Sequence, residues 1–414
     1  MFRSPLRPLL PLLAILISAQ AVAASARDAG APVPETLGSF TLVATGDVMM
    51  HEAVKQSAET HGFDSLFAQV KPLLRGADVA FANLETPVAP QANRGTKPFI
   101  FNAPVELLPA LREAGFSLLS FANNHAYDQG VAGVLETLAN LKSAGLSEVG
   151  AGATAAEALT PLILERHGVR TGFLGGTTRF NQNLNSADPK RPYVVEAASD
   201  ALAVAIAALA KTVDAVVVSV HWGNEYEGEP AQEQVDLARR LVEAGALVVL
   251  GSHPHVLQRI ELLPTPDGRV ALVAYSLGNF VSNQSRDYSD GPAPPPAGDP
   301  RDGALLELTL RKRRYLGGRV VTDVGRAAVL PLWTDNNALE RKRLPKLSVD
   351  IQVVDLDKEL RADEAELKLM ATPPHALSEE QQTKAMKLQQ RVELLTLRRL
   401  RINDRLGGEY VGVP

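Results

Sequence analysis

Cysteine is absent from this chain of 414 residues. Its absence excludes disulfide bonds, thiolate metal ligands, a lipid-modified cysteine and a cysteine nucleophile. We therefore expect the apolar core alone to stabilise the fold. Any metal ion must be bound through oxygen and nitrogen atoms.

An excess of positive charge is also lacking, because 42 Lys and Arg residues stand against 47 Asp and Glu residues. The net charge of −5 argues against nucleic acid as a partner, since binding to phosphates needs a basic face. Three short basic clusters, at 311–314, 341–343 and 398–401, are interpreted as solvated faces. A Gly-x-Ser-x-Gly elbow and a Gly-rich phosphate loop are both missing, which argues against the enzyme classes that depend on them.

Long apolar runs are missing except near the N-terminus, where Arg3 and Arg7 precede an apolar stretch at 9–17. Ala21-Val-Ala23 then resembles a cleavage site, and the whole order is typical of a secretory signal peptide at 1–24. The apolar stretch is short for a membrane span. We therefore expect a periplasmic or secreted protein, with anchoring to the membrane by an uncleaved N-terminal segment as the alternative.

The rest of the chain alternates short apolar runs with amphipathic helical patterns, and 45% of all residues are hydrophobic. This alternation predicts an α/β fold with largely parallel strands that are covered on both faces. Ligands of such sheets gather at the carboxyl ends of the strands. The expected strands lie at 40–44, 78–82, 117–122, 171–175, 215–220, 247–250 and 271–275, and the clearest helices lie at 131–141 and 232–244.

The C-terminal third has a different pattern. A Pro- and Gly-rich stretch at 286–303 is interpreted as a surface loop, and 304–310 and 319–329 as antiparallel strands at a sheet edge. Ser378-Glu-Glu-Gln381 is a capping box that opens a helix reaching to about Ile402. We assign 38–335 to one domain and 345–414 to a helical extension. The apolar positions of the last helix, Ala385, Leu388, Val392 and Leu395, could pack on the body or on a partner.

Five of the eight histidines follow expected strands: His51, His125, His221, His253 and His255. Imidazoles and carboxylates delivered from successive strand ends are what a polynuclear metal site requires. In His253-Pro-His255, the proline should hold His253 extended, so that both imidazoles face one metal site. The alternative for this pair is a structural role in capping a turn.

Oxygen ligands are expected beside these imidazoles. Asp47, in Thr45-Gly-Asp47, is interpreted as a ligand, although it could be a helix N-cap. Glu85 is placed to bridge two cations, with a salt bridge as the alternative. In Asn124-His125, the amide is interpreted as a ligand and the unligated imidazole as a proton donor. His221 ends a very apolar run, where a histidine without a partner would be costly to bury.

A further set of polar and aromatic residues is predicted to contact substrate. Trp222 could equally belong to the core, and Asn279 could instead support a ligand or fix its own loop. The predicted substrate contacts are Asn83, Trp222, Glu225 and Asn279.

These motifs together resemble the CapA family of capsule-synthesis proteins, which is associated with poly-γ-glutamate production. The resemblance spans about residues 38–330. It rests on Gly46-Asp47-Val-Met-Met-His51, Asn83-Leu-Glu85, Asn123-Asn-His125-x-x-Asp128-x-Gly130, His221-Trp-Gly223-x-Glu225, Gly251-x-His253-Pro-His255 and Ser276-Leu-Gly-Asn279. The family in turn resembles metallo-dependent phosphatases. That resemblance implies a four-layer α/β/β/α sandwich, followed here by a C-terminal helical extension, and two divalent ions such as Mn, Fe or Zn.

The resemblance also implies roles for single residues. It makes Glu85 the metal-bridging carboxylate and His125 the general acid. It makes metal ligands of Asp47, His51, Glu85, Asn124, His221, His253 and His255. The chain departs from the phosphatase pattern in three ways: His51 lies four residues after Asp47 rather than two, Asn83-Leu-Glu85 replaces the Gly-Asp-x-x-Asp motif, and Ala126 replaces the acid that follows the Asn-His pair.

The function expected from these features is metal-dependent hydrolysis or transfer on a capsule-type polymer or a phosphorylated small molecule. The alternatives are a non-catalytic module that binds an anionic polymer through the same cations, and a structural partner of a membrane synthase. An unligated His125 favours the enzyme, because a binding module has no use for a proton donor.

Overall fold

The computed structural model describes residues 33–92, 99–288, 294–371 and 377–408, so the predicted signal peptide at 1–24 lies outside the described residues. Two sheets carry the fold, with strand orders β16-β15-β14-β1-β2-β3-β4 and β11-β12-β10-β9-β7-β6, and β13 also pairs with β1. The strands of the first sheet are β1 Glu35–Val48, β2 Val79–Leu84, β3 Leu118–Ser120, β4 Ser147–Val149, β13 Asn279–Val281, β14 Asp302–Arg314, β15 Val320–Asn336 and β16 Ile351–Asp355. Those of the second are β6 Leu162–Arg166, β7 Val169–Thr177, β9 Ala215–His221, β10 Val248–Ser252, β11 Leu257–Pro264 and β12 Val270–Leu277.

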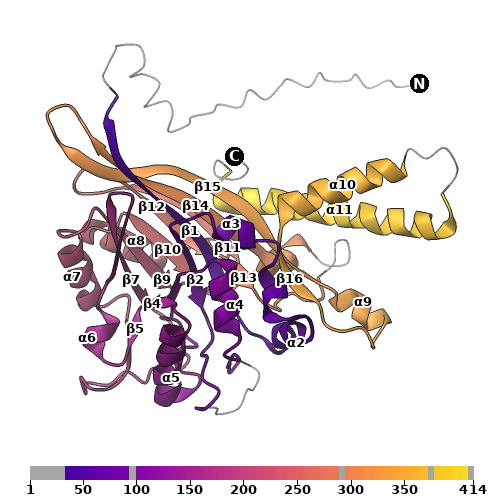
Figure 1. The fold of residues 1–414 in the computed structure, drawn as a ribbon, viewed down its shortest axis with the longest axis horizontal. Helices are drawn as coiled ribbons and strands as arrows, with labels where there is room; N and C mark the ends of the chain where they lie inside the picture. Colours follow the sequence, from indigo (N-terminus) through magenta and orange to yellow (C-terminus); the bar gives the residue numbers. More distant parts are fainter. Residues whose placement is uncertain (1–32, 93–98, 289–293, 372–376, 409–414) are drawn as a thin grey trace, which may run out of the picture.

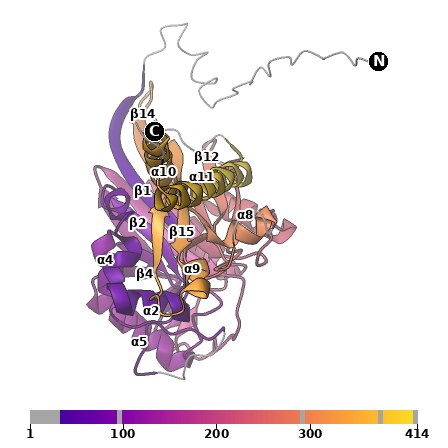
Figure 2. The same cartoon turned by 90° about the vertical axis from the view of Figure 1, so that its right-hand side faces the viewer.

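The helices within 52–143 cover the outer face of the first sheet, and those within 155–244 cover the outer face of the second. A small two-stranded ladder is formed by β5 (Ala151–Gly152) and β8 (Tyr193–Val194). The helices are α2 Glu52–His61, α3 Lys71–Leu74, α4 Leu107–Ala114, α5 Gly130–Ser143, α6 Ala155–Ala158, α7 Asp200–Leu209, α8 Gln232–Ala244, α9 Ala338–Arg343, α10 Leu356–Met370 and α11 Glu379–Leu406, with 3-10 helices η2 Phe63–Phe67 and η3 Pro295–Arg301. In Figure 2, α2 and α4 lie on one side of the strands and α8 on the other.

Three apolar clusters define the layers, because neighbouring residues of a strand point to opposite faces of its sheet. Leu42 of β1 belongs to the cluster between the two sheets, and Val43 belongs to the cluster under the helices of the first sheet. Val217 of β9 likewise joins the inter-sheet cluster, while Val216 packs against α7 and α8. The predicted four-layer α/β/β/α sandwich is therefore confirmed.

The centres of both sheets are parallel, as predicted. The strands β1 to β4 pair in parallel, and so do β7, β9, β10 and β12. Antiparallel strands close the edges: β14, β15 and β16 in the first sheet, and β6 and β11 in the second. The prediction of antiparallel edge strands near 304–310 and 319–329 is thus confirmed.

The stretch 286–303 is only partly the surface loop that its composition predicts. It contains η3 and the first residues of β14, and Asp299 and Asp302 within it are buried. Arg398 of α11 binds both carboxylates. The prediction of a solvated face at 398–401 is therefore wrong for Arg398, whose side chain is fully buried and paired with Asp299 and Asp302.

The last helix begins at the predicted capping box, where the Ser378 hydroxyl accepts a hydrogen bond from the backbone amide of Gln381. With α10 it forms the helical hairpin at the right of Figure 1. Its C-terminal half packs on the body, because Leu395, Ile402 and Leu406 are buried in the inter-sheet cluster. Among the described residues, every helix is too short or too polar to cross a membrane.

Candidate metal centre

The predicted site residues gather at the carboxyl ends of the parallel strands. Asp47 lies at the end of β1, in register with Asn83 of β2 and Asn279 of β13. His221 is the last residue of β9, and the turn after β10 carries His253 and His255. One edge of the sandwich therefore receives side chains from both sheets.

A close backbone approach holds Asp47 at this edge. The Asp47 amide donates a hydrogen bond of 3.0 Å to the carbonyl of Gly278. A Cβ atom on Gly46 would lie 1.8 Å from that carbonyl oxygen, so no larger residue fits there without a shift of the backbone. The end of β1 at Thr45-Gly-Asp47 therefore depends on glycine for a steric reason.

Three groups of side chains place candidate ligand atoms within 4.8 Å of one another. The first joins Asp47, Glu85 and His255, and the second joins Glu85, His221 and His253. A third joins the exposed Glu225 to His253 and His255. Glu85 belongs to both buried groups, which is the position predicted for a bridging carboxylate.

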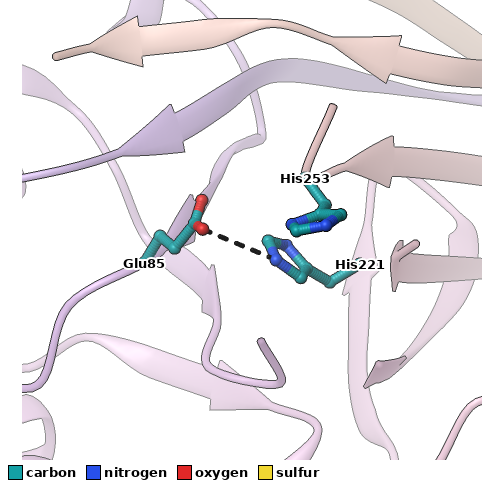
Figure 3. Close-up of side chains that lie close together, drawn as sticks. All are labelled: Glu85, His221 and His253. Carbon is teal, nitrogen blue, oxygen red and sulfur yellow. Dashed lines mark ion pairs between the residues drawn. The ribbon is translucent and has the colours of Figure 1, made fainter. Parts of the chain in front are cut away.

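Figure 3 shows Glu85, His221 and His253 converging from three different segments of the chain. Glu85 Oε1 lies 3.5 Å from Nε2 of His221 and 3.7 Å from Nε2 of His255. Asn124 Oδ1 lies 2.8 Å from Nε2 of His221, so the predicted amide ligand also faces this group. Asp47 Oδ2 lies 3.3 Å from Nδ1 of His255.

Buried amides and a hydroxyl hold these side chains in place. The Asn83 Nδ2 group donates to Asp47 Oδ1 at 2.8 Å and lies 3.2 Å from Nδ1 of His221. The Ser252 hydroxyl lies 2.9 Å from the same nitrogen, and Asn279 Oδ1 lies 3.1 Å from Nδ1 of His255. Such contacts fix the orientation of an imidazole and thereby the nitrogen that it offers to a metal.

The His253-Pro-His255 segment converges for a reason other than the one predicted. The prediction of an extended His253 is wrong, because φ is +96° at His253 and +57° at His255. The chain turns through the left-handed region at both residues, and this strain is typical of functional sites. The ring centroids of the two imidazoles lie 5.7 Å apart, and His253 lies 4.6 Å from His221. His255 instead faces Asp47, so the two imidazoles serve different buried groups.

The electrostatics of the cluster fit a divalent cation. Both carboxylate oxygens of Glu85 are buried without a hydrogen bond to any described residue. Burial, reinforced by the negative charge of Asp47, raises the pKa of Glu85 well above its ordinary value of 4.5. Burial lowers the pKa of His221 well below its ordinary value and that of His253 to about 3. Neutral imidazoles and a buried carboxylate that lacks a compensating charge are suited to bind a metal, and an oxygen and nitrogen donor set suits Mn, Fe or Zn.

His125 is placed beside the cluster and belongs to none of the three groups. Its Nδ1 atom lies 2.7 Å from Asp128 Oδ2, and its ring centroid lies 4.4 Å from that of Phe101. Asp128, three residues after His125 in the same turn, is the acidic residue that contacts the imidazole. This spacing was the available sequence signal for Asp128, which the predicted site did not include.

Asn181 was also missed. Its backbone amide donates to the carbonyl of Asn124, and its Nδ2 atom lies 3.5 Å from both ring nitrogens of His125. The residue is exposed at the rim of the site. It comes from the segment after β7, in the other sheet, so no local pattern in the sequence linked it to His125.

The remaining predicted residues lie in different surroundings. Nδ1 of His51 accepts a hydrogen bond of 3.3 Å from the backbone amide of Asn283, and the imidazole packs edge-on against Phe101. His51 lies in none of the three ligand groups formed by described residues. Burial, together with nearby His255 and His125, lowers the pKa of His51 to about 4. Its predicted role as a ligand remains a prediction.

Three of the four predicted substrate contacts are shielded from solvent. Asn83, Trp222 and Asn279 are each at most 1% exposed. The Trp222 indole stacks on Tyr275 and donates to its carbonyl, so this residue belongs to the core. Asn83 and Asn279 hold ligand candidates in place, whereas Glu225 is exposed. The contacts of these three residues with substrate remain predictions.

The chain is similar in sequence to bacterial capsule synthesis proteins. The family model for the bacterial capsule synthesis protein PGA_cap matches residues 41–284. The PGA biosynthesis protein CapA of Bacillus subtilis is 33% identical over 302 residues, which cover 72% of this chain and 75% of that protein. The capsule biosynthesis protein CapA of Bacillus anthracis is 34% identical over 324 residues, which cover 76% and 74%. Among solved structures, the NAD nucleotidase of Haemophilus influenzae is 14% identical with a TM-score of 0.42, over 86% of this chain and 60% of that one.

Replacement of His253 or His255 by Ala tests the ligand assignment. We expect metal affinity, measured by calorimetry with Mn²⁺ or Zn²⁺, to fall by more than the 10- to 100-fold typical of groups that only orient a ligand. The melting temperature in chelator should stay close to that of the wild type, because side chains at strand ends add little to the apolar core. His61→Ala is the matched control, since His61 contacts the Val349 carbonyl and lies outside the cluster. Wild-type metal affinity with a lowered melting temperature would give the pair a structural role instead.

Glu85→Gln tests the electrostatic argument. The folded-state pKa of Glu85 is raised, so its stabilising contribution is complete below about pH 4.5 and is lost as the pH rises through the folded-state value. In chelator near neutral pH, the Gln variant should therefore be more stable than the wild type in urea unfolding, and the difference should shrink toward pH 4. Added Mn²⁺ should stabilise the wild type much more than the variant. A variant that is less stable in chelator at neutral pH would refute the argument.

Proposed function

This chain belongs to the PGA_cap family of bacterial capsule synthesis proteins, and we propose that it is an exported, metal-dependent hydrolase or transferase. Its proposed substrate is a poly-γ-glutamate-type polymer or a phosphorylated precursor of one. One observation carries the proposal of catalysis: the hydrogen-bonded pair of His125 and Asp128 stands beside the ligand cluster without belonging to it. A module that only binds a polymer has no need of such a pair.

Two divalent ions are proposed, because Glu85 is shared by the two buried ligand groups. Asp47, Glu85 and His255 would hold one ion. Glu85, Asn124, His221 and His253 would hold the other. Bound there, the ions would polarise the oxygen of the scissile bond and lower the pKa of an attacking water.

The side chains of the protein account for the proton transfer. Asp128 engages Nδ1 of His125, so the exchangeable proton of the imidazole is at Nε2. In the proposed reaction, Nε2 gives this proton to the leaving nitrogen or oxygen as its bond to the substrate breaks. Solvent then returns a proton to the imidazole. Asn181, next to both ring nitrogens and exposed, is suited to orient the leaving group toward His125.

The partners are proposed from the same family membership. Both Bacillus relatives carry names that place them in capsule or PGA biosynthesis. An anionic polymer would be drawn to cations held by the cluster, and Glu225 at its exposed side would help to exclude wrongly placed carboxylates by charge repulsion. The alternative is that the chain acts as a structural partner of a membrane synthase.

His125→Ala separates an enzyme from a binding module. Phosphoester, amide and glycan substrates would be screened with added Mn²⁺, Fe²⁺ and Zn²⁺ to find the reaction of the wild type. We expect the variant to lose about 10²- to 10⁴-fold in kcat, because it lacks the proton donor, while its metal content stays unchanged. His167→Ala is the matched control, since His167 is exposed and pairs with Asp78. If neither wild type nor variant turns over any substrate and both bind polymer equally, the protein is a binding module or a synthase partner.

Export rests on the signal-peptide pattern at 1–24. Mass spectrometry of the protein isolated from cell fractions should find a chain that begins near residue 25 in the periplasm or the medium. An intact N-terminus in the membrane fraction would identify an uncleaved anchor. Recovery of the intact chain from the cytoplasm would contradict export.

A further inference from the structure

The C-terminal helix α11 is fastened to the body by a buried arginine. The Arg398 guanidinium donates from Nε to Asp302 Oδ1 at 2.9 Å and from Nη2 to Asp299 Oδ1 at 2.7 Å. All three side chains are at least nine-tenths buried. Arg401 adds a two-point contact to Asp299 at 2.8 and 2.7 Å. This anchor fixes η3 and the start of β14, which contain the two aspartates.

The segment that Arg398 holds is hydrogen-bonded to a residue that supports the ligand cluster. Pro300 lies between the two aspartates, and its carbonyl accepts a hydrogen bond of 2.9 Å from Nδ2 of Asn279. The same amide side chain presents Oδ1 to Nδ1 of His255 at 3.1 Å. A short chain of contacts therefore runs from Arg398 through the η3 backbone and Asn279 to His255.

A second route leads from the same anchor to Asp47. Gly303, next to Asp302, forms a β-bridge with Gly278. The Gly278 carbonyl is the acceptor for the Asp47 amide. Asp47 and His255 belong to one ligand group, so both routes end at the same half of the cluster.

The end of α11 also touches the loop that carries Glu225. The guanidinium of Arg405 packs so tightly on Gly228 that a Cβ atom there would lie 2.1 Å from Nη1. Gln258 Nε2 donates to the carbonyls of Glu227 and Glu229 and fixes the same loop from β11. Thus α11 supports the sides of the site that hold His255 and Glu225.

We propose that α11 is a positioning element for the metal centre, and that Arg398 sets the orientation of His255 through Pro300 and Asn279. The inference rests on the proposed function, in which His255 is a metal ligand. The family match ends at residue 284, so the anchor and α11 lie beyond the matched region. The helical extension would then complete the half of the site formed by Asp47, Glu85 and His255.

Arg398→Lys tests the inference, because lysine keeps the charge but cannot contact both aspartates with a planar fork. We expect the Kd for Mn²⁺, measured by calorimetry on the full chain, to rise about tenfold, at the low end of the range for groups that orient a ligand. Asn279→Ala should have the same or a larger effect. In the double variant, Arg398→Lys should add little to Asn279→Ala, since both act on His255 through one path.

Two control variants separate positioning from stability. Leu395→Ala, one turn earlier on α11 and buried in the inter-sheet core, should lower the melting temperature and leave the Kd unchanged. Arg399→Lys alters a half-exposed pair with Asp357 on α10 and should change neither property. If Arg398→Lys does not fold, Arg401→Lys weakens the same anchor from its partly exposed side and should also raise the Kd.

The possible results separate a failure of the proposed function from a failure of the inference about α11. A wild type that binds neither Mn²⁺ nor Zn²⁺ overturns both the proposed function and this inference. Metal binding that is lost in His255→Ala but unchanged in folded Arg398→Lys or Arg401→Lys overturns the inference alone. A raised Kd in Leu395→Ala equal to that in Arg398→Lys, or full additivity of Arg398→Lys with Asn279→Ala, also overturns it.

Discussion

The buried carboxylate of Glu85 is the constraint on which the site depends. It is fully enclosed, accepts no hydrogen bond from a described residue, and has neutral imidazoles and another acid as neighbours. Burying a charge in this way is unfavourable unless an opposite charge is bound nearby. The arrangement is therefore suited to a cation, which would compensate the charge of Glu85.

The two sheets and the C-terminal helix together build the surroundings of Glu85. The first sheet contributes Asp47 and Glu85, and the second contributes His221 and the turn with His253 and His255. The inter-sheet core packs the two sheets against each other, so the ends of their strands meet at one edge of the sandwich. The last helix buries Leu395, Ile402 and Leu406 in that core, so the extension belongs to the sandwich that carries the site.

Local pattern predicted much of this architecture. Helix α8 has the bounds expected from its periodicity, and the capping box at Ser378 opens α11. The four layers follow from parallel strands that are buried on both faces. The sequence alone also placed the candidate ligands at one edge, since each follows a strand whose direction the alternation with helices determines.

The tertiary structure decided what depends on contacts between distant residues. In the folded chain, Asp128 contacts His125, and Asn181, which follows a strand of the other sheet, lies beside the same ring. The side chain of Trp222 packs in the core against Tyr275. The tertiary structure also buries Arg398, which a basic cluster in sequence suggested to be solvated. The left-handed conformations at His253 and His255 also belong here. Composition and periodicity report which face of an element is apolar, whereas ion pairs, strained turns and the assignment of polar groups to ligand or support depend on packing between segments far apart in the chain.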